Sequence, residues 1–179
     1  MHPYIHAKNT PNKAAFIMAS SGKITTYKEL DERSNQIAHL FRARGLKVGD
    51  GISLFMENNS RFLEICWAAQ RSGLYFTPIS SRLTAGEVEY IHRDCNSKLI
   101  ISSSYLASTA KDLVKMTTYT PNHLMVDGTE EGWESFEIAI EEFPKTPIND
   151  EEMGQDMLYS SGTTGKPKGI RSPLKNIPI

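Results

Sequence analysis

Residues 51–79, GISLFMENNSRFLEICWAAQRSGLYFTPI, hold a helical pattern between two short apolar runs. The runs 51–56 and 75–79 have the length and composition of buried strands. Between them Ser60 is a candidate N-cap, apolar residues recur at helical spacing, and Gly73 is a stop signal. A strand, a helix and a second strand joined by short connections predict two parallel strands of one sheet.

The same alternation continues on both sides of this stretch. Capping boxes at 26–29 and 84–87 predict two more helices, and residues 106–116 predict another. Strands are expected at 14–18, 98–101, 124–126, 157–160 and 169–171. Acidic residues accumulate between 130 and 152, and we expect residues 128–150 to be irregular or exposed. The predicted fold class is therefore α/β, a mostly parallel sheet with helices on its faces.

Residues 159–169, YSSGTTGKPKG, combine three glycines, four aliphatic hydroxyls, two lysines and a proline. Glycine N–H groups can form a nest for an anion, hydroxyls donate hydrogen bonds, and lysines make charge-assisted bonds to phosphate. The order is not that of a Walker A loop, because proline follows Lys166, and it lacks the Gly-x-Gly of a dinucleotide site. A flexible Ser/Gly linker is the alternative. The ordered block behind a strand-like segment favours binding of a polyphosphate.

Residues 160–169 resemble the phosphate loop of the adenylate-forming superfamily, which includes acyl-CoA synthetases, luciferases and peptide-synthetase adenylation domains. Earlier segments, TPNKAA at 10–15, TYKELD at 26–31 and GLYFTPI at 73–79, stand in the order expected of that superfamily. The resemblance thus covers nearly the whole chain, as part of a large N-terminal α/β domain. It implies a two-step reaction, in which a carboxylic acid and ATP give an acyl-adenylate and pyrophosphate, and coenzyme A then displaces AMP. Mg²⁺ is the implied metal cofactor.

The resemblance also implies which residues bind ATP, and all lie in the loop: Ser160, Ser161, Gly162, Thr163, Thr164, Gly165 and Lys168. Of these, Ser160 and Gly165 are expected to shape the turn, and the others to contact phosphate. Lys166 is open to two interpretations, a phosphate contact or an exposed lysine. Leu174 stands where many members have a histidine, so that histidine's role in the acyl pocket is not carried over. Arg171 could face the pocket, but a surface position is favoured.

Two parts are expected, a partial N-terminal α/β subdomain at 1–155 and a unit of strand, phosphate-binding loop and strand at 156–179. The resemblance further implies a second subdomain with adenine and acyl pockets, a glutamate that binds Mg²⁺, and a C-terminal domain with a catalytic lysine. We expect these to be absent from the chain, which is then an N-terminal fragment, inactive alone and without catalytic residues. A non-catalytic nucleotide-binding module and an interaction remnant are the alternatives.

Composition limits the remaining function classes. Hydrophobic residues make up 39% and charged residues 23% of the chain, which is typical of a soluble globular domain. The net charge of −1 gives no basic field for nucleic acid. No apolar run approaches the roughly 20 residues that span a bilayer, and the N-terminus has no signal pattern. Cys66 and Cys95 are expected to be buried free thiols in a reducing cytoplasm. The expected partner is a small carboxylic acid: fatty, aryl and carnitine-like acids are all open, and a fatty or medium-chain acid is slightly favoured. The oligomeric state is not indicated.

Overall fold

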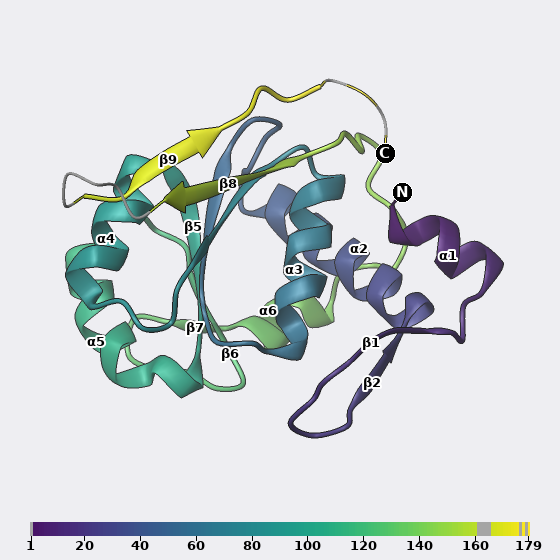
Figure 1. Ribbon diagram of the computed structural model, residues 1–179, viewed down its shortest axis with the longest axis horizontal. Helices are drawn as coiled ribbons and strands as arrows, with labels where there is room; N and C mark the ends of the chain where they lie inside the picture. The colour runs from purple at the N-terminus through teal and green to yellow at the C-terminus, as the bar shows by residue number, and fades with distance from the viewer. Residues whose placement is uncertain (1, 161–165, 176, 178) are drawn as a thin grey trace.

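The computed structural model describes residues 2–160, 166–175, 177 and 179, and its centre is a mostly parallel sheet (Figure 1). The strand order is β7-β6-β5-β3-β4-β8-β9, and only the β8–β9 pair is antiparallel. The strands are β3 (Gly51–Phe55), β4 (Tyr75–Ile79), β5 (Ser97–Ser103), β6 (His123–Val126), β7 (Glu134–Ser135), β8 (Gln155–Ser160) and β9 (Lys168–Arg171). The expected fold class, α/β with a mostly parallel sheet, is confirmed.

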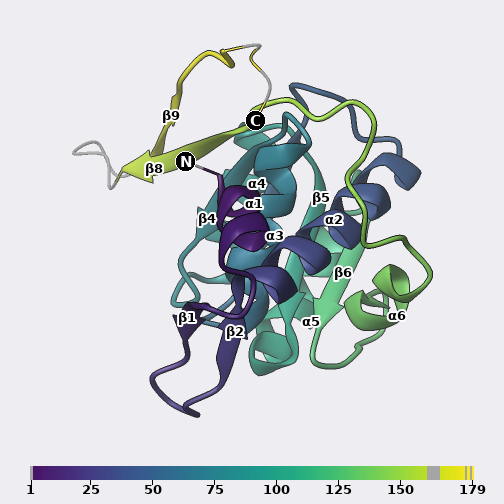
Figure 2. The same cartoon turned by 90° about the vertical axis from the view of Figure 1, so that its right-hand side faces the viewer.

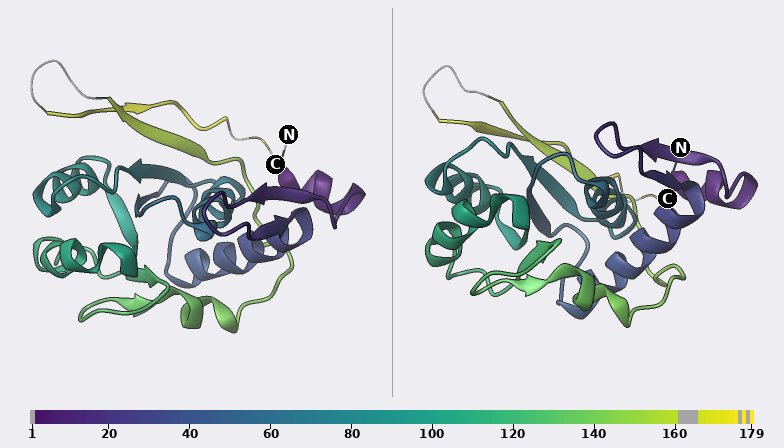
Figure 3. Two further views of the ribbon diagram at one scale, coloured as in Figure 1. Left: turned by 60° about the horizontal axis from the view of Figure 1, so that its bottom comes forward. Right: turned by 90° about the horizontal axis from the view of Figure 1, so that it is seen from below.

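Helices cover both faces of this sheet, as Figure 3 shows. One face carries α2 (Tyr27–Ala43), α3 (Ser60–Arg71) and α6 (Phe136–Glu141). The other carries α4 (Ala85–Asp94) and α5 (Ala107–Met116), the latter preceded by the short 3₁₀ turn η1 (Ser104–Leu106). The side chains of β3 alternate between the two faces and so contribute to both cores. Leu54 packs with α2 and α3, whereas Phe55 packs with α4 and α5.

The chain reverses direction across the sheet at β3. From β3 it passes through α3 to β4 on one side, and then through α4 to β5 on the other side. Strand β8 joins beyond β4, but its register covers only Tyr75↔Gln155 and Phe76↔Asp156. Beyond this point β8 pairs with β9 alone, and Figure 2 shows the β8–β9 hairpin extending away from the sheet. The described ends of the predicted loop therefore lie on a ribbon at the sheet's edge.

Both predicted capping boxes are confirmed. Thr26 Oγ1 accepts from Glu29 N at 3.2 Å while the Glu29 carboxylate accepts from Thr26 N at 2.8 Å, and the box at 84–87 has the same pattern. The predicted N-cap of α3 is wrong, because the side chain of Asn59 caps that helix by accepting from Arg61 N at 2.9 Å. Ser60 is instead its first helical residue.

The expectation of an irregular segment at 128–150 is wrong in part. This segment contains β7 and α6, and Phe136 and Ile140 of α6 are buried in the core beside α2. Helix α1 (Pro3–Asn9) and strand β2 (Ile24–Thr26) were not predicted either, and β2 pairs antiparallel with β1 (Ala14–Ile17). In the described part of the chain, none of the helices combines the length and apolar composition needed to cross a membrane.

Candidate functional site

The β8–β9 hairpin carries the predicted phosphate loop. Ser160 is the last residue of β8 and Lys168 the first of β9, and the two are cross-strand partners with exposed side chains. The Ser160 hydroxyl donates to the Lys168 carbonyl at 3.5 Å. The other predicted residues, Ser161, Gly162, Thr163, Thr164 and Gly165, lie outside the described residues. The ends of the loop are therefore defined by a pair of strands.

The start of β8 is fixed against α3 and β4. Gly154 N donates to the Gln70 carbonyl at 2.6 Å, and Gln155 N donates to the Leu74 carbonyl at 3.0 Å. A Cβ at Gly154 would lie 2.4 Å from the Leu74 oxygen, so only glycine allows this approach. Just before it, Glu151 lies 3.5 Å from the buried Arg71 guanidinium. The chain thus enters the hairpin from a fixed point.

Tyr159 links the first strand of the hairpin to helix α4. Its cross-strand partner is Gly169, the last glycine of the motif, and a Cβ at Gly169 would lie 2.9 Å from Tyr159 Cζ. The ring therefore passes over a residue that has no side chain. Beyond it, the Tyr159 hydroxyl donates to Asp94 Oδ2 at 2.6 Å. Burial and this hydrogen bond raise the pKa of Tyr159, so the phenol stays protonated and remains a donor.

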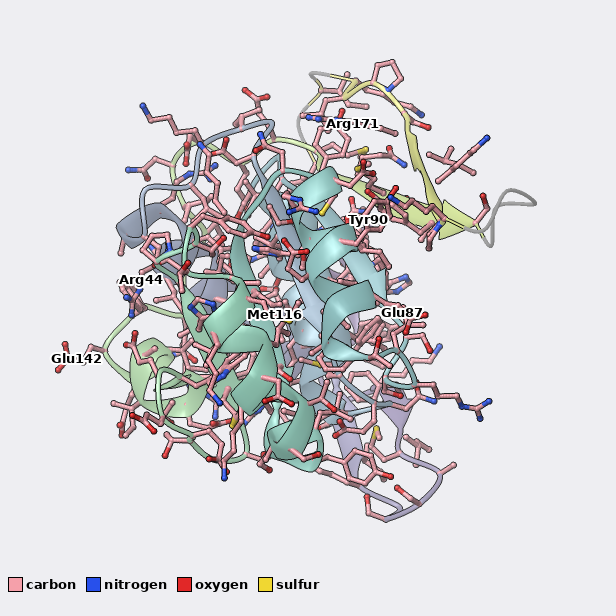
Figure 4. All side chains as sticks on the ribbon, turned by 90° about the vertical axis from the view of Figure 1, so that its left-hand side faces the viewer. Arg44, Glu87, Tyr90, Met116, Glu142 and Arg171 are labelled. Carbon is pink, nitrogen blue, oxygen red and sulfur yellow. The ribbon has the colours of Figure 1, made fainter. Side chains whose placement is uncertain are left out.

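Tyr90 links the other end of the loop to the same helix. Its hydroxyl donates to the Pro167 carbonyl at 3.3 Å. The Lys166 ammonium lies 5.4 Å from the centroid of the Tyr90 ring, within the range of a cation–π contact. Figure 4 shows Tyr90 on the side of α4 nearest the β8–β9 hairpin. Lys166 is exposed, as one of its two interpretations expects, and it also contacts this ring.

Arg171 fastens the end of β9 to the sheet. Its guanidinium carbon lies 4.0 Å from the centroid of the Tyr75 ring, and Nη2 donates to the Gly49 carbonyl at 3.2 Å. The Tyr75 hydroxyl donates in turn to the Ser172 carbonyl at 2.9 Å. Arg171 is exposed, in line with the favoured surface position. Leu174 packs against the small cluster that contains Tyr75 and Met157, so it serves as a packing residue here.

Sequence reasoning missed the residues that hold the hairpin, namely Tyr75, Tyr90 and Asp94. Tyr90 reads as a core residue from its helical spacing, and its ring does pack partly against the core. The sequence does contain a tyrosine immediately before the motif, Tyr159, and two more in earlier elements, Tyr75 and Tyr90. These tyrosines do not reveal their partners, because Tyr159 and Asp94 are 65 residues apart in the chain.

The chemistry of this region suits an anion. Lys166, Lys168 and Arg171 bring three positive charges to one short hairpin. Among the described residues, no group of three or more His, Cys, Asp or Glu side chains could hold a metal ion. A second candidate position is the carboxyl end of β3 and β5, where the strand order reverses. There Ser103 donates to Glu57, and Asn59 donates to Asp127 at 2.8 Å. The polar side chains at this position therefore already form hydrogen bonds within the protein. The hairpin is the better candidate for a phosphate.

Comparisons with known proteins identify the family of the chain. Residues 4–177 match the model of a family described as AMP-binding enzyme. The chain is 30% identical over 166 residues to a fatty acid–[acyl-carrier-protein] ligase of Streptomyces coeruleorubidus, covering 92% of this chain and 31% of that protein. It is 29% identical over 167 residues to a long-chain-fatty-acid–CoA ligase of Mycobacterium tuberculosis, covering 90% and 32%.

The fold is also found in a solved structure, that of an anthranilate CoA ligase in complex with anthranoyl-AMP. The TM-score is 0.81 at 24% sequence identity, and the match covers 94% of this chain and 33% of that one. The chain therefore spans about a third of the length of each of these three proteins.

Proposed function

Because the chain belongs to the AMP-binding enzyme family, we propose that its β8–β9 hairpin holds the phosphates of ATP while a carboxylic acid is activated as an acyl-adenylate. The observation that carries this proposal is the position of SSGTTGKPKG, which begins at the last residue of β8 and ends within β9. A segment of this composition combines hydroxyls, backbone N–H groups and lysines, which suits a polyphosphate.

In the proposed first step, a carboxylate oxygen attacks the α-phosphorus of ATP, and the bond from that phosphorus to the pyrophosphate oxygen breaks. Charge develops on the departing pyrophosphate. Donors fixed in advance around it lower the barrier, because they need not reorganise during the reaction. We assign the phosphate contacts to Ser161, Gly162, Thr163, Thr164 and Lys168. Ser160 and Gly165 shape the turn, and the hairpin positions the α-phosphate for attack.

In the proposed second step, a thiol attacks the acyl carbon and AMP leaves, which gives a thioester. Coenzyme A is the first candidate for the thiol, and an acyl-carrier protein is the second, because one relative is named as a ligase for that acceptor. The relatives' names also support a fatty acid as the substrate class. A cytoplasmic location fits the use of ATP and coenzyme A. Mg²⁺ would accompany ATP, but the described residues bring no set of metal ligands together, so no step is assigned to it.

Binding of pyrophosphate with Mg²⁺ tests the proposed role of the hairpin. Calorimetric titration of the 179-residue chain should give a measurable affinity, and Lys168→Ala should weaken it about tenfold through loss of one charge-assisted contact. Lys115→Ala is the matched control, because it removes the same charge from an exposed position on α5. The absence of binding by the unaltered chain, or an equal loss in both variants, would contradict the proposal.

We further propose that this polypeptide does not form acyl-adenylate by itself. It spans about a third of the relatives, and its assigned residues are phosphate contacts only. Incubation with ATP, Mg²⁺, hydroxylamine and a series of fatty acids should give no hydroxamate. ATP-dependent hydroxamate above the level without enzyme would show that these residues complete the reaction, and would refute this part of the proposal.

A further inference from the structure

Helix α4 contacts the chain on both sides of the loop. Before the loop, Tyr159 donates to Asp94 Oδ2 at 2.6 Å; after it, Pro167 accepts from Tyr90 at 3.3 Å. Asp94 and Tyr90 are four residues apart, so they lie one above the other on the same face of the helix. One rigid element therefore fixes the separation of the two chain segments that enter and leave the loop.

We propose that Tyr90, Asp94 and Tyr159 are positioning residues, which hold the ends of the loop on α4 and so prepare it to bind a polyphosphate. This inference rests on the function proposed above for the same loop. Preparing a binding segment before the ligand arrives increases affinity, because less conformational entropy is lost on binding. None of the three residues needs to touch the phosphate.

The hairpin needs such an anchor because the sheet holds it weakly. Strand β8 pairs with β4 at two residues only, and all four residues of β9 are exposed. A two-stranded hairpin is marginally stable without packing on a third element. Helix α4 supplies that packing near the loop, whereas the stack of Arg171 on Tyr75 holds the other end of β9.

Gly169 makes the anchor possible. Tyr159 reaches Asp94 by passing over Gly169, where a Cβ would lie 2.9 Å from Tyr159 Cζ and 2.6 Å from Met157 Cε. Its backbone has no positive φ, so its role here is to allow close approach and not an unusual conformation. The last glycine of the motif is then required by a contact outside the phosphate site.

The charge of Asp94 allows an electrostatic role and a positioning role to be distinguished by the direction in which the affinity changes. A carboxylate near a polyphosphate site repels the ligand, so an electrostatic role for Asp94 predicts that its removal increases affinity. A positioning role predicts that removal decreases affinity. Asp94→Asn separates charge from hydrogen bonding, because the amide oxygen still accepts from Tyr159 and the charge is gone.

The test is a titration of pyrophosphate with Mg²⁺ into the 179-residue chain and its variants, after circular dichroism has verified that each is folded. Tyr159→Phe and Asp94→Ala should each weaken binding about five- to tenfold, as expected for loss of a charge-assisted hydrogen bond. The affinity of the double variant should lie within about twofold of that of either single variant, because both substitutions remove the same contact. Asp94→Asn should bind more tightly than Asp94→Ala.

Tyr119→Phe is the matched control. The Tyr119 hydroxyl donates to Glu89 on the same helix at 3.3 Å, so this variant loses the same kind of bond away from the hairpin. It should bind pyrophosphate as the unaltered chain does. The inference would be overturned if Tyr159→Phe and Asp94→Ala bound pyrophosphate as tightly as the unaltered chain, if Asp94→Ala bound it more tightly, or if Tyr119→Phe lost as much affinity as Tyr159→Phe.

The two proposals fail in different ways. If the unaltered chain binds no pyrophosphate, the proposed function is contradicted and the positioning role falls with it. If the unaltered chain binds and Lys168→Ala binds more weakly, while Tyr159→Phe binds normally, only the positioning role is contradicted. Hydrogen exchange of β8 and β9 without ligand adds an independent readout. It should be faster in Tyr159→Phe than in the unaltered chain, and an unchanged rate would count against the anchor.

Discussion

The ring of Tyr159 occupies the space that a side chain at Gly169 would need, since an added Cβ would lie 2.9 Å from Tyr159 Cζ. The two residues are partners across the β8–β9 hairpin. A glycine at the end of a phosphate-loop motif is therefore explained here by packing. The contact joins the motif to helix α4, because the same tyrosine donates to Asp94.

Gly169→Ala should destabilise the chain by about 1–2 kcal/mol, because the methyl group displaces the tyrosine ring from its position. Gly86→Ala is the control. Gly86 lies in α4, and an added Cβ there meets nothing nearer than Met116 Cε at 3.9 Å. It should stabilise the chain by up to about 1 kcal/mol through helix propensity. Urea unfolding measures both, and a cost no larger for Gly169→Ala than for Gly86→Ala would argue against the packing explanation.

Asn59→Ala should cost about 1 kcal/mol of unfolding free energy, because it removes the side chain that caps α3. Ser60→Ala should change stability by less than about 0.5 kcal/mol, since Ser60 is the first helical residue and not the cap. The pair of variants differs by one position and distinguishes the observed cap from the one that the sequence suggests. A larger effect for Ser60→Ala would restore the sequence-based assignment.

Stability should fall as the pH falls from about 7 to 5, partly because of His92. This side chain is fully buried between Ser53 and Thr120, and burial lowers its pKa from 6.5 to about 4. Between these two values the unfolded state binds a proton that the folded state does not, so acid favours unfolding. The expected contribution is about 2 kcal/mol between pH 7 and 5. His92→Gln should reduce the pH dependence by that amount, and an unchanged dependence would refute the assignment.

Both cysteines should resist modification in the folded chain. Cys66 and Cys95 are free thiols with 7% and 5% of their surface exposed, as the sequence suggests. Burial raises the pKa of Cys66 to about 12, which keeps it protonated and poorly nucleophilic. A thiol-reactive dye should label neither residue within minutes at neutral pH and both in guanidinium chloride. Rapid labelling without denaturant would mean that α3 or α4 opens locally.

Features that depend on neighbouring residues could be predicted from the sequence. The capping boxes at Thr26 and Thr84, the strands of the parallel core and the fold class all follow from local spacing. Helix α6 was missed because charged residues surround its buried face, of which Phe136 and Ile140 are the members. Apolar spacing over six residues is too short to decide between helix and loop.

The candidate site divides in the same way. The motif and its chemistry are local, so its residues could be named in advance, and their roles in ATP binding, those of Ser160 and Lys168 included, stay predictions. The anchors are not local. Tyr90 and Pro167 are 77 residues apart, and Arg171 and Gly49 are 122 apart. Such pairs depend on the path that β8 takes away from the sheet, and this path cannot be predicted from the spacing of residues along the chain.

Hydrogen exchange of residues 155–172 with and without Mg²⁺ and pyrophosphate tests the central claim most directly. If the β8–β9 hairpin holds a polyphosphate, ligand should slow exchange in peptides that cover 160–168, while peptides from α2 and α5 stay unchanged. Lys168→Ala should reduce the difference. Equal exchange with and without ligand at concentrations of a few millimolar, or protection confined to other segments, would contradict the claim that this loop binds phosphate.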